Sequence, residues 1–104
     1  MKFLMKVSMS TEGGNRAVLS GSLGSTMQSI LADIKPESVY FTAEGGRRTG
    51  YLIININDPS EIPGISEPFF LSFDAEVAFY PAMSPQDLAN AGPGIERAAK
   101  KYGK

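Results

Sequence analysis

The stretch SVYFTAEGGRRTGYLIININ, residues 38–57, decides the fold of this 104-residue chain, because it contains two β-strands joined by a turn. Residues 38–44 and 51–57 are rich in aromatic and β-branched side chains, which favour strands. The glycine-containing residues 45–50 lie between them and predict a hairpin loop of six residues. Both alternating sets of side chains in residues 51–57 include large apolar residues, so we expect this strand in the middle of a sheet that is covered on both faces.

The segments on either side predict further strands and helices. Residues 2–9 alternate with a period of two and predict the first strand. A helical stripe follows and predicts one helix that is capped by Asn15 and ends before Pro36. Residues 58–73 predict a second helical segment, which Pro63, Gly64 and Pro68 should make short or irregular. Residues 76–83 predict the fourth strand.

The order β-α-β-β-α-β predicts a single α+β domain over residues 1–104 with the ferredoxin-like fold: a four-stranded antiparallel sheet with both helices on one face. Extra helical turns follow at the C-terminus. Residues 84–87, Ser-Pro-Gln-Asp, match a capping box, and Gly92-Pro93 introduces a last helix. That helix has an apolar face formed by Ile95, Ala98, Ala99 and Tyr102.

Composition excludes several classes of function. The chain has no cysteine and no histidine, which excludes disulfides and thiolate catalysis and removes the usual ligands of zinc, copper and haem. We therefore expect no metal and no cofactor. Ten basic and eleven acidic residues give a net charge of -1, a poor match to a nucleic-acid-binding protein. Lys6 interrupts the apolar N-terminal run and no segment has the length of a membrane span, so we expect a cytoplasmic protein with no membrane partner.

One face of the predicted sheet has no helices to cover it. It would hold Leu4, Tyr40, Tyr51 or Ile53, Ala78 and Tyr80. An aromatic surface of this extent on a small protein marks an interface or a ligand groove. Pairing with a second copy about a two-fold axis, to give a homodimer, is the commonest solution. The alternative is that the C-terminal helix folds back over this face with Ile95, Ala99 and Tyr102.

Residues 67–77, EPFFLSFDAEV, followed by Pro81 and Ser84-Pro85, together with the order of elements, resemble the dimeric α+β-barrel superfamily. Within it, the chain is most similar to muconolactone-isomerase-like small bacterial proteins of unknown function. The resemblance implies two ferredoxin-like protomers that pair sheet against sheet. The superfamily includes cofactor-free monooxygenases, isomerases, haem-handling enzymes and proteins without known activity. The matching residues form a helix end, a strand and a turn, and no catalytic signature of the isomerase is matched.

Several side chains are candidates for a binding site. Arg47 and Arg48 in the glycine-rich turn could bind an anion together, or could be two solvated arginines on a hairpin. The full set of candidate ligand-binding residues is Lys6, Tyr40, Arg47, Arg48, Tyr51 and Tyr80. Glu76 is the candidate catalytic carboxylate. It could take part in acid–base catalysis with Glu12 or Glu44 only if the fold brought their side chains together.

Glycines and methionines leave two interpretations open. Gly21 and Gly24 lie inside the predicted helix, where each costs roughly 1 kcal/mol relative to alanine. They either permit close packing or leave space for a ligand. The methionines Met5, Met9, Met27 and Met83 either fill the core or line an adaptable pocket.

The function these features favour is the binding of a small, partly aromatic or acidic molecule by a homodimer. The binding surface would lie between sheet and helices or at the mouth of the barrel. The alternatives are a cofactor-independent isomerase or monooxygenase, and a structural or interaction module without catalysis. Charge is unevenly distributed: residues 49–96 contain seven acids and no Lys or Arg, whereas residues 97–104 carry four positive charges. This pattern favours self-assembly over polyanion binding.

Overall fold

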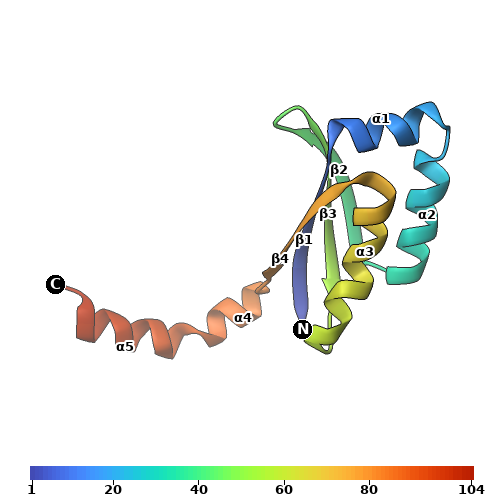
Figure 1. The fold of residues 1–104 in the computed structure, drawn as a ribbon. Coiled ribbons are helices and arrows are strands. Elements are labelled where there is room, and N and C mark those ends of the chain that lie inside the picture. The colour runs from blue at the N-terminus through green and yellow to red at the C-terminus, as the bar shows by residue number, and fades with distance from the viewer.

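The computed structural model describes residues 1–104 and contains one four-stranded sheet (Figure 1). The strands are β1 (Lys2–Met9), β2 (Ser38–Glu44), β3 (Arg47–Asn55) and β4 (Ala75–Pro81). Their spatial order is β2-β3-β1-β4, and every neighbouring pair is antiparallel. This order is that of the ferredoxin-like fold, and the predicted α+β class is confirmed.

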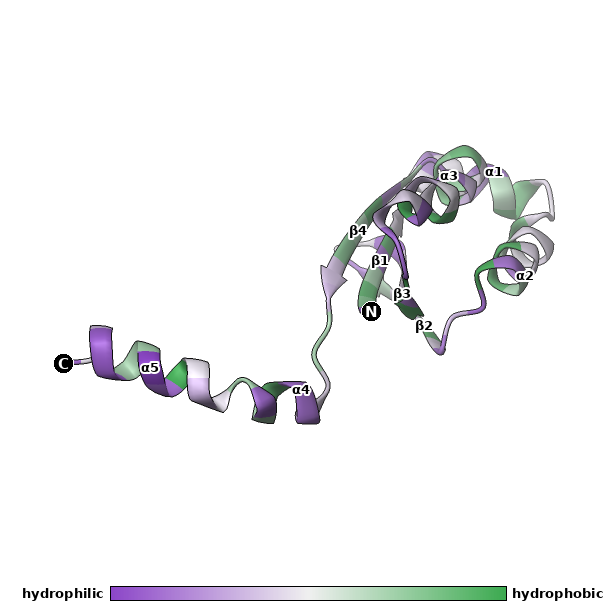
Figure 2. Cartoon of the chain, turned by 90° about the horizontal axis from the view of Figure 1, so that it is seen from below, coloured by the Kyte–Doolittle hydropathy of each residue, from purple (hydrophilic) through white to green (hydrophobic).

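Three helices cover one face of the sheet and leave the other face open (Figures 1 and 2). They are α1 (Thr11–Leu19), α2 (Leu23–Ile34) and α3 (Ile62–Phe73), the last preceded by the short 3-10 helix η1 (Pro59–Glu61). We call the uncovered side of the sheet the open face. No helix of the structure combines the length and the apolar character needed to cross a membrane.

The core lies between the helices and the central strands β1 and β3. Met5 pairs with Leu52 across the two strands, and both side chains are almost completely buried. Phe69 and Phe73 of α3 pack over them and are each 1% exposed. The predicted central position of the third strand is confirmed, because β3 has a neighbour on each side. The expected cover on both faces is not found within the chain, because Tyr51 and Ile53 on the open face are only partly buried.

The first helical region differs from its prediction, because it forms two helices and Asn15 is not a cap. Ser10 caps α1 by accepting a hydrogen bond from the Gly13 amide at 2.9 Å. The chain turns at Gly21, whose φ of +73° suits glycine, and α2 begins at Leu23. Close packing does not explain Gly21 or Gly24, since a Cβ atom at either position would have no neighbour within 4 Å.

The hairpin also differs from its prediction, because its loop is two residues long. Gly45 and Gly46 have φ values of +59° and +77°, as in a type I′ turn, and Glu44 pairs with Arg47. Residues Arg47 to Gly50, which the sequence predicts in the loop, belong to β3. The glycine pair permits the tight turn, so the strands continue to its edge.

The remaining boundaries shift by a few residues. The strand expected at 51–57 ends at Asn55, and the one expected at 76–83 is Ala75–Pro81. Of the expectation of a short or irregular helix over residues 58–73, the short length is wrong, because α3 runs for 12 residues, whereas the irregularity is confirmed by the 3-10 turn Pro59–Glu61 that precedes it. Pro63 lies in its first turn, where the missing N–H is not needed, and only Pro68 is inside the helix.

Beyond β4 the chain leaves the domain. Residues 82–104, which we call the C-terminal arm, contain α4 (Pro85–Asn90) and α5 (Gly92–Tyr102). The predicted capping box is confirmed, since Ser84 Oγ accepts from the Asp87 amide and Asp87 Oδ2 accepts from the Ser84 amide. The alternative in which the C-terminal helix folds back over the open face is wrong: Figures 1 and 2 show the arm pointing away from the domain. The molecule is accordingly 58 Å long and 29 by 21 Å across.

A close approach between α1 and the end of α3 explains Gly13. A Cβ atom there would lie 2.7 Å from the carbonyl carbon of Phe73 and closer still to its oxygen. Replacing Gly13 by Ala should lower the free energy of unfolding by about 1–3 kcal/mol, because backbone must move. Gly64→Ala is the control: a Cβ atom there meets nothing within 4 Å, so gain of helix propensity should stabilise by ~1 kcal/mol. Urea unfolding measures both, and equal stability of the two variants would contradict this packing.

Candidate functional site

A pocket of about 470 Å³ lies between α2 and the β2–β3 end of the sheet. Its volume is in the range of small-molecule sites, ~300–1,000 Å³. The wall is mainly apolar, and the lining residues are Val7, Met9, Leu23, Gly24, Met27, Phe41, Thr42, Ala43, Arg48, Thr49, Gly50, Leu52 and Phe69. The arrangement fits a ligand with an apolar body.

The pocket exists because the helices do not seal the outer strand β2. Phe41 points to the helical side of the sheet, opposite Gly50 of β3, yet 58% of it is exposed. Gly24 of α2 lines the same pocket and has no atom within 4 Å of where its Cβ would lie. Of the two interpretations of Gly24, space for a ligand therefore agrees with the structure.

Arg48 is the only charged residue of the pocket lining. Its Nη1 and Nη2 atoms each donate a hydrogen bond to Asn15 Oδ1 at 3.2 Å. The absence of a side chain at Gly14 makes room for the guanidinium, because a Cβ atom there would lie 2.6 Å from Nη1. No carboxylate forms an ion pair with Arg48. A guanidinium that is held in place and has no anionic partner is suited to bind an anionic group.

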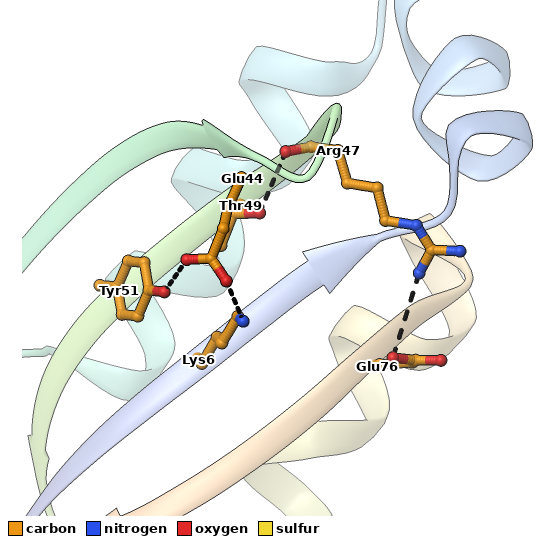
Figure 3. A network of polar contacts seen from close by, with 6 residues as sticks. All are labelled: Lys6, Glu44, Arg47, Thr49, Tyr51 and Glu76. Atoms are coloured by element: carbon orange, nitrogen blue, oxygen red, sulfur yellow. Dashed lines mark hydrogen bonds and ion pairs between the residues drawn. The ribbon is translucent and has the colours of Figure 1, made fainter.

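The open face carries a second group of polar side chains (Figure 3). Glu44 of β2 accepts hydrogen bonds from Lys6 of β1 and from the hydroxyl of Tyr51 of β3. Nearby, the guanidinium of Arg47 lies 4.0 Å from the carboxylate of Glu76. These pairs join all four strands across the face.

The pKa values of Glu44, Lys6 and Tyr51, which we call the Glu44 cluster, all move away from neutrality. The hydrogen bond from Lys6, followed by that from Tyr51, lowers the pKa of Glu44. The bond to Glu44 raises the pKa of Lys6 and is also the main cause of the raised pKa of Tyr51. General acids and bases work best with a pKa near the operating pH. The cluster therefore holds strands together and is poorly matched to proton transfer near pH 7.

A smaller depression of about 270 Å³ lies on the open face beside β1 and β4. Lys6, Glu76 and Tyr80 contribute to its lining. The Glu76 side chain is 84% exposed. The third carboxylate of the sequence analysis, Glu12, pairs with Arg16 on α1, so Glu12, Glu44 and Glu76 do not meet.

The structure separates the residues that the sequence analysis selected. Lys6, Tyr40, Arg47, Tyr51, Glu76 and Tyr80 all lie on the open face, whereas Arg48 lies at the pocket on the opposite side. Arg47 and Arg48 therefore do not form a joint anion site within one chain, because consecutive strand residues point to opposite faces.

Phe41 and Leu23 line the pocket but were not among the site residues predicted from the sequence. Asn15, which accepts the bonds from Arg48, was not among them either. Among the methionines, Met9 and Met27 line the pocket, Met5 is in the core and Met83 is on the arm. The signals in the sequence for this site were Arg48 in the glycine-rich turn, the methionines, and Gly24, which stands inside a helical stripe at a cost in helix propensity.

Comparisons with known proteins assign no family to the chain. No protein-family model matches the sequence, and a search of curated proteins found no match. No group of three or more His, Cys, Asp or Glu side chains is placed to hold a metal ion.

The Glu44 cluster predicts a specific pH dependence of stability. The lowered pKa of Glu44 stabilises the fold above the pKa of an unfolded glutamate, about 4.3, and this contribution is lost as the pH falls through the folded value. The raised pKa values of Lys6 and Tyr51 contribute below about pH 10 and are lost as the pH rises. In urea unfolding, Glu44→Gln should therefore be less stable than wild type between about pH 5 and 10, and the difference should shrink on both sides.

The ultraviolet absorbance of tyrosinate gives an independent measurement. The phenol of Tyr51, identified by its loss in Tyr51→Phe, should ionise above the pKa of free tyrosine in wild type and at lower pH in Glu44→Gln. The control is Glu67→Gln, which removes an exposed carboxylate outside the cluster. A Tyr51 titration that Glu44→Gln leaves unchanged would contradict the hydrogen bond.

Proposed function

We propose that this protein binds a small molecule with an apolar, partly aromatic body and one anionic group, in the pocket between α2 and the β2–β3 end of the sheet. The observation that carries the proposal is the pocket of about 470 Å³ with a single charged residue, Arg48, in its lining. Phe41 offers an aromatic surface, and Leu23 and Met27 offer aliphatic and thioether contacts.

Arg48 supplies the specificity in this proposal. A guanidinium forms two parallel hydrogen bonds with a carboxylate, and these charge-assisted bonds are about twice as strong as neutral ones. Asn15 Oδ1 accepts from both terminal nitrogens and limits the rotation of the group. The remaining donors of the guanidinium are free for a ligand, because Arg48 has no ion pair within the chain.

The proposal includes self-association of the chain as a homodimeric α+β barrel, in which the open faces of two protomers pair. Tyr40 is 72% exposed and Tyr80 is 52% exposed on this face, and Leu4 and Ile53 are only partly buried. Large apolar side chains grouped on one surface favour an interface. The likeness of residues 67–85 to the dimeric α+β-barrel superfamily supports the same arrangement.

Binding is favoured over catalysis by the state of the two candidate carboxylates. An enzyme with a carboxylate base would need Glu44 or Glu76 buried beside a tyrosine in a closed pocket. Glu44 contacts Tyr51 but lies on the open face with a lowered pKa, and Glu76 is highly exposed. Neither lines the large pocket.

The neighbouring arginines provide a matched pair of variants for testing the anion site. We expect Arg48→Gln to weaken the binding of 2-naphthoate about tenfold, equivalent to ~1.4 kcal/mol, because the charged hydrogen bonds are lost. Arg47→Gln, one residue away on the other face, should bind like wild type. Isothermal titration calorimetry measures both, with the neutral analogue 2-naphthalenemethanol as a second probe that neither variant should affect. Equal losses for the two variants, or no binding of 2-naphthoate to wild type at millimolar concentration, would overturn the proposed site.

Filling the pocket tests its apolar part. Gly24→Leu adds a side chain where there is open space, so it should abolish the binding of both naphthalene probes. The same change should not lower the free energy of unfolding, since leucine has a higher helix propensity than glycine by roughly 0.8–1 kcal/mol. Gly64→Leu, in an exposed turn of α3, is the control for binding. Retention of probe binding by Gly24→Leu would place the probes elsewhere.

A further inference from the structure

The C-terminal arm presents an apolar surface that its own chain does not cover. No residue of α4 or α5 is buried. An apolar stripe runs along α5, as the sequence predicts, and consists of residues at helical spacing: Ile95, Ala98, Ala99 and Tyr102. Ile95 is 57% exposed and Tyr102 is 72% exposed. The radius of gyration is 17.5 Å, whereas a packed chain of this length has about 13 Å, so the arm stands clear of the domain.

Helices of this length need a partner to be stable. In water, isolated helices shorter than about 12–15 residues are marginal even for favourable sequences. α4 has 6 residues and α5 has 11. The capping box at Ser84 helps α4 begin but cannot replace tertiary packing. The stripe of α5 is therefore expected to pack on another surface.

The direction of the arm indicates where that surface lies. Figures 1 and 2 show that α1, α2 and α3 lie on one side of the sheet and that the arm leaves the end of β4 and extends away from the domain toward the opposite side. The open face and helix α5, which carries the stripe, thus lie on the same side of the sheet. A second copy placed against the open face would lie within reach of the arm.

The charges of the chain are complementary to this arrangement. Residues 97–104 contain Arg97, Lys100, Lys101 and Lys104 and no acid. Residues 49–96 contain seven acids and no basic residue, and most of these acids are exposed on the domain. The domain of a second copy, residues 1–81, has nine acidic and six basic residues, so its net charge is opposite to that of residues 97–104, which favours association.

From these observations we propose that the C-terminal arm is exchanged between two copies of this chain, with the Ile95–Tyr102 stripe of each α5 packed on the domain of the other. In a two-fold dimer both arms are buried in the same way, so the assembly closes. This inference rests on the self-association proposed above and is independent of the ligand pocket.

A mixed-label experiment tests the exchange directly, because the chain has no native cysteine. Arg97→Cys carries a nitroxide on the side of α5 opposite the stripe. It is mixed with ¹⁵N-labelled wild type, which has no cysteine and therefore no nitroxide. We expect broadening of domain amides in the ¹⁵N-labelled chain, since only an arm from another copy brings the spin label to it. Reduction of the nitroxide should restore the signals.

Sedimentation velocity with stripe variants supplies the energetic test. Ile95→Asp should raise the dimer dissociation constant at least tenfold, whereas Gln86→Asp, an exposed position on α4 with the same added charge, should change it less than twofold. Both variants should keep the affinity of wild type for 2-naphthoate.

The outcomes separate this inference from the proposed function. A wild-type dimer without broadening in the mixture, or one that Ile95→Asp leaves unchanged, would overturn arm exchange and leave the sheet-to-sheet pairing standing. A wild-type protein that stays monomeric at 100 μM would overturn both. Amide protection of α5 in a monomer only when vesicles of anionic phospholipid are added would overturn arm exchange in favour of a lipid surface.

Discussion

The strict alternation of side chains along β1 and β3 is the constraint on which the rest of the structure depends. In the register of these two central strands, Lys6 pairs with Tyr51 and Met5 with Leu52. Consecutive residues alternate, so the first pair lies on the open face and the second pair faces the helices. A slip of one residue would move every apolar side chain of a strand to the wrong face. Because β1 also pairs with β4 and β3 with β2, this register determines which residues all four strands present to the helices.

The pocket follows from how the helical layer is built. α1 is held against the end of α3, where Gly13 passes the Phe73 carbonyl, and the chain then turns at Gly21. Of the two short helices joined there, α1 contacts β3, whereas α2 contacts α1 and α3, and the helical side of β2 stays partly open. Phe41 of β2 therefore stays exposed although its side chain faces the helices. The residues that line the pocket come from α2, from the loop side of β2 and β3 and from the core, and Phe41 stands at its exposed edge.

The sequence predicted the fold better than the site, and the reason is physical. Strand alternation and helical stripes are local patterns, so the four strands and the order of elements could be predicted from neighbouring residues. The break at Gly21 was missed because the stripe from Leu19 to Ile34 runs through it. The two-residue turn at Gly45-Gly46 was missed because the following arginines resemble a loop, although a Gly-Gly pair permits a type I′ turn. That turn places Arg47 and Arg48 in a strand, which separates them.

Contacts between distant segments could not be predicted in this way. Asn15 and Arg48 are 33 residues apart, and only the packing of α1 beside β3 brings the amide oxygen to the guanidinium. The same holds for Lys6 and Glu44, 38 residues apart, which meet because β1, β3 and β2 are adjacent. Nothing in the local sequence distinguishes Glu44 from other surface carboxylates.

The sheet itself separates the two surfaces of interest. The pocket lies on the helical side, whereas the open face and the arm lie on the other, with the full thickness of the sheet between them. If α5 becomes ordered only on association, the free energy needed to order it weakens the dimer. The packing of the stripe must then contribute more free energy than the ordering costs. Stability then depends on protein concentration, because only the associated state buries the stripe. The proposed ligand pocket and the proposed arm exchange use residues on opposite sides of the sheet, so the two proposals are separable by mutation.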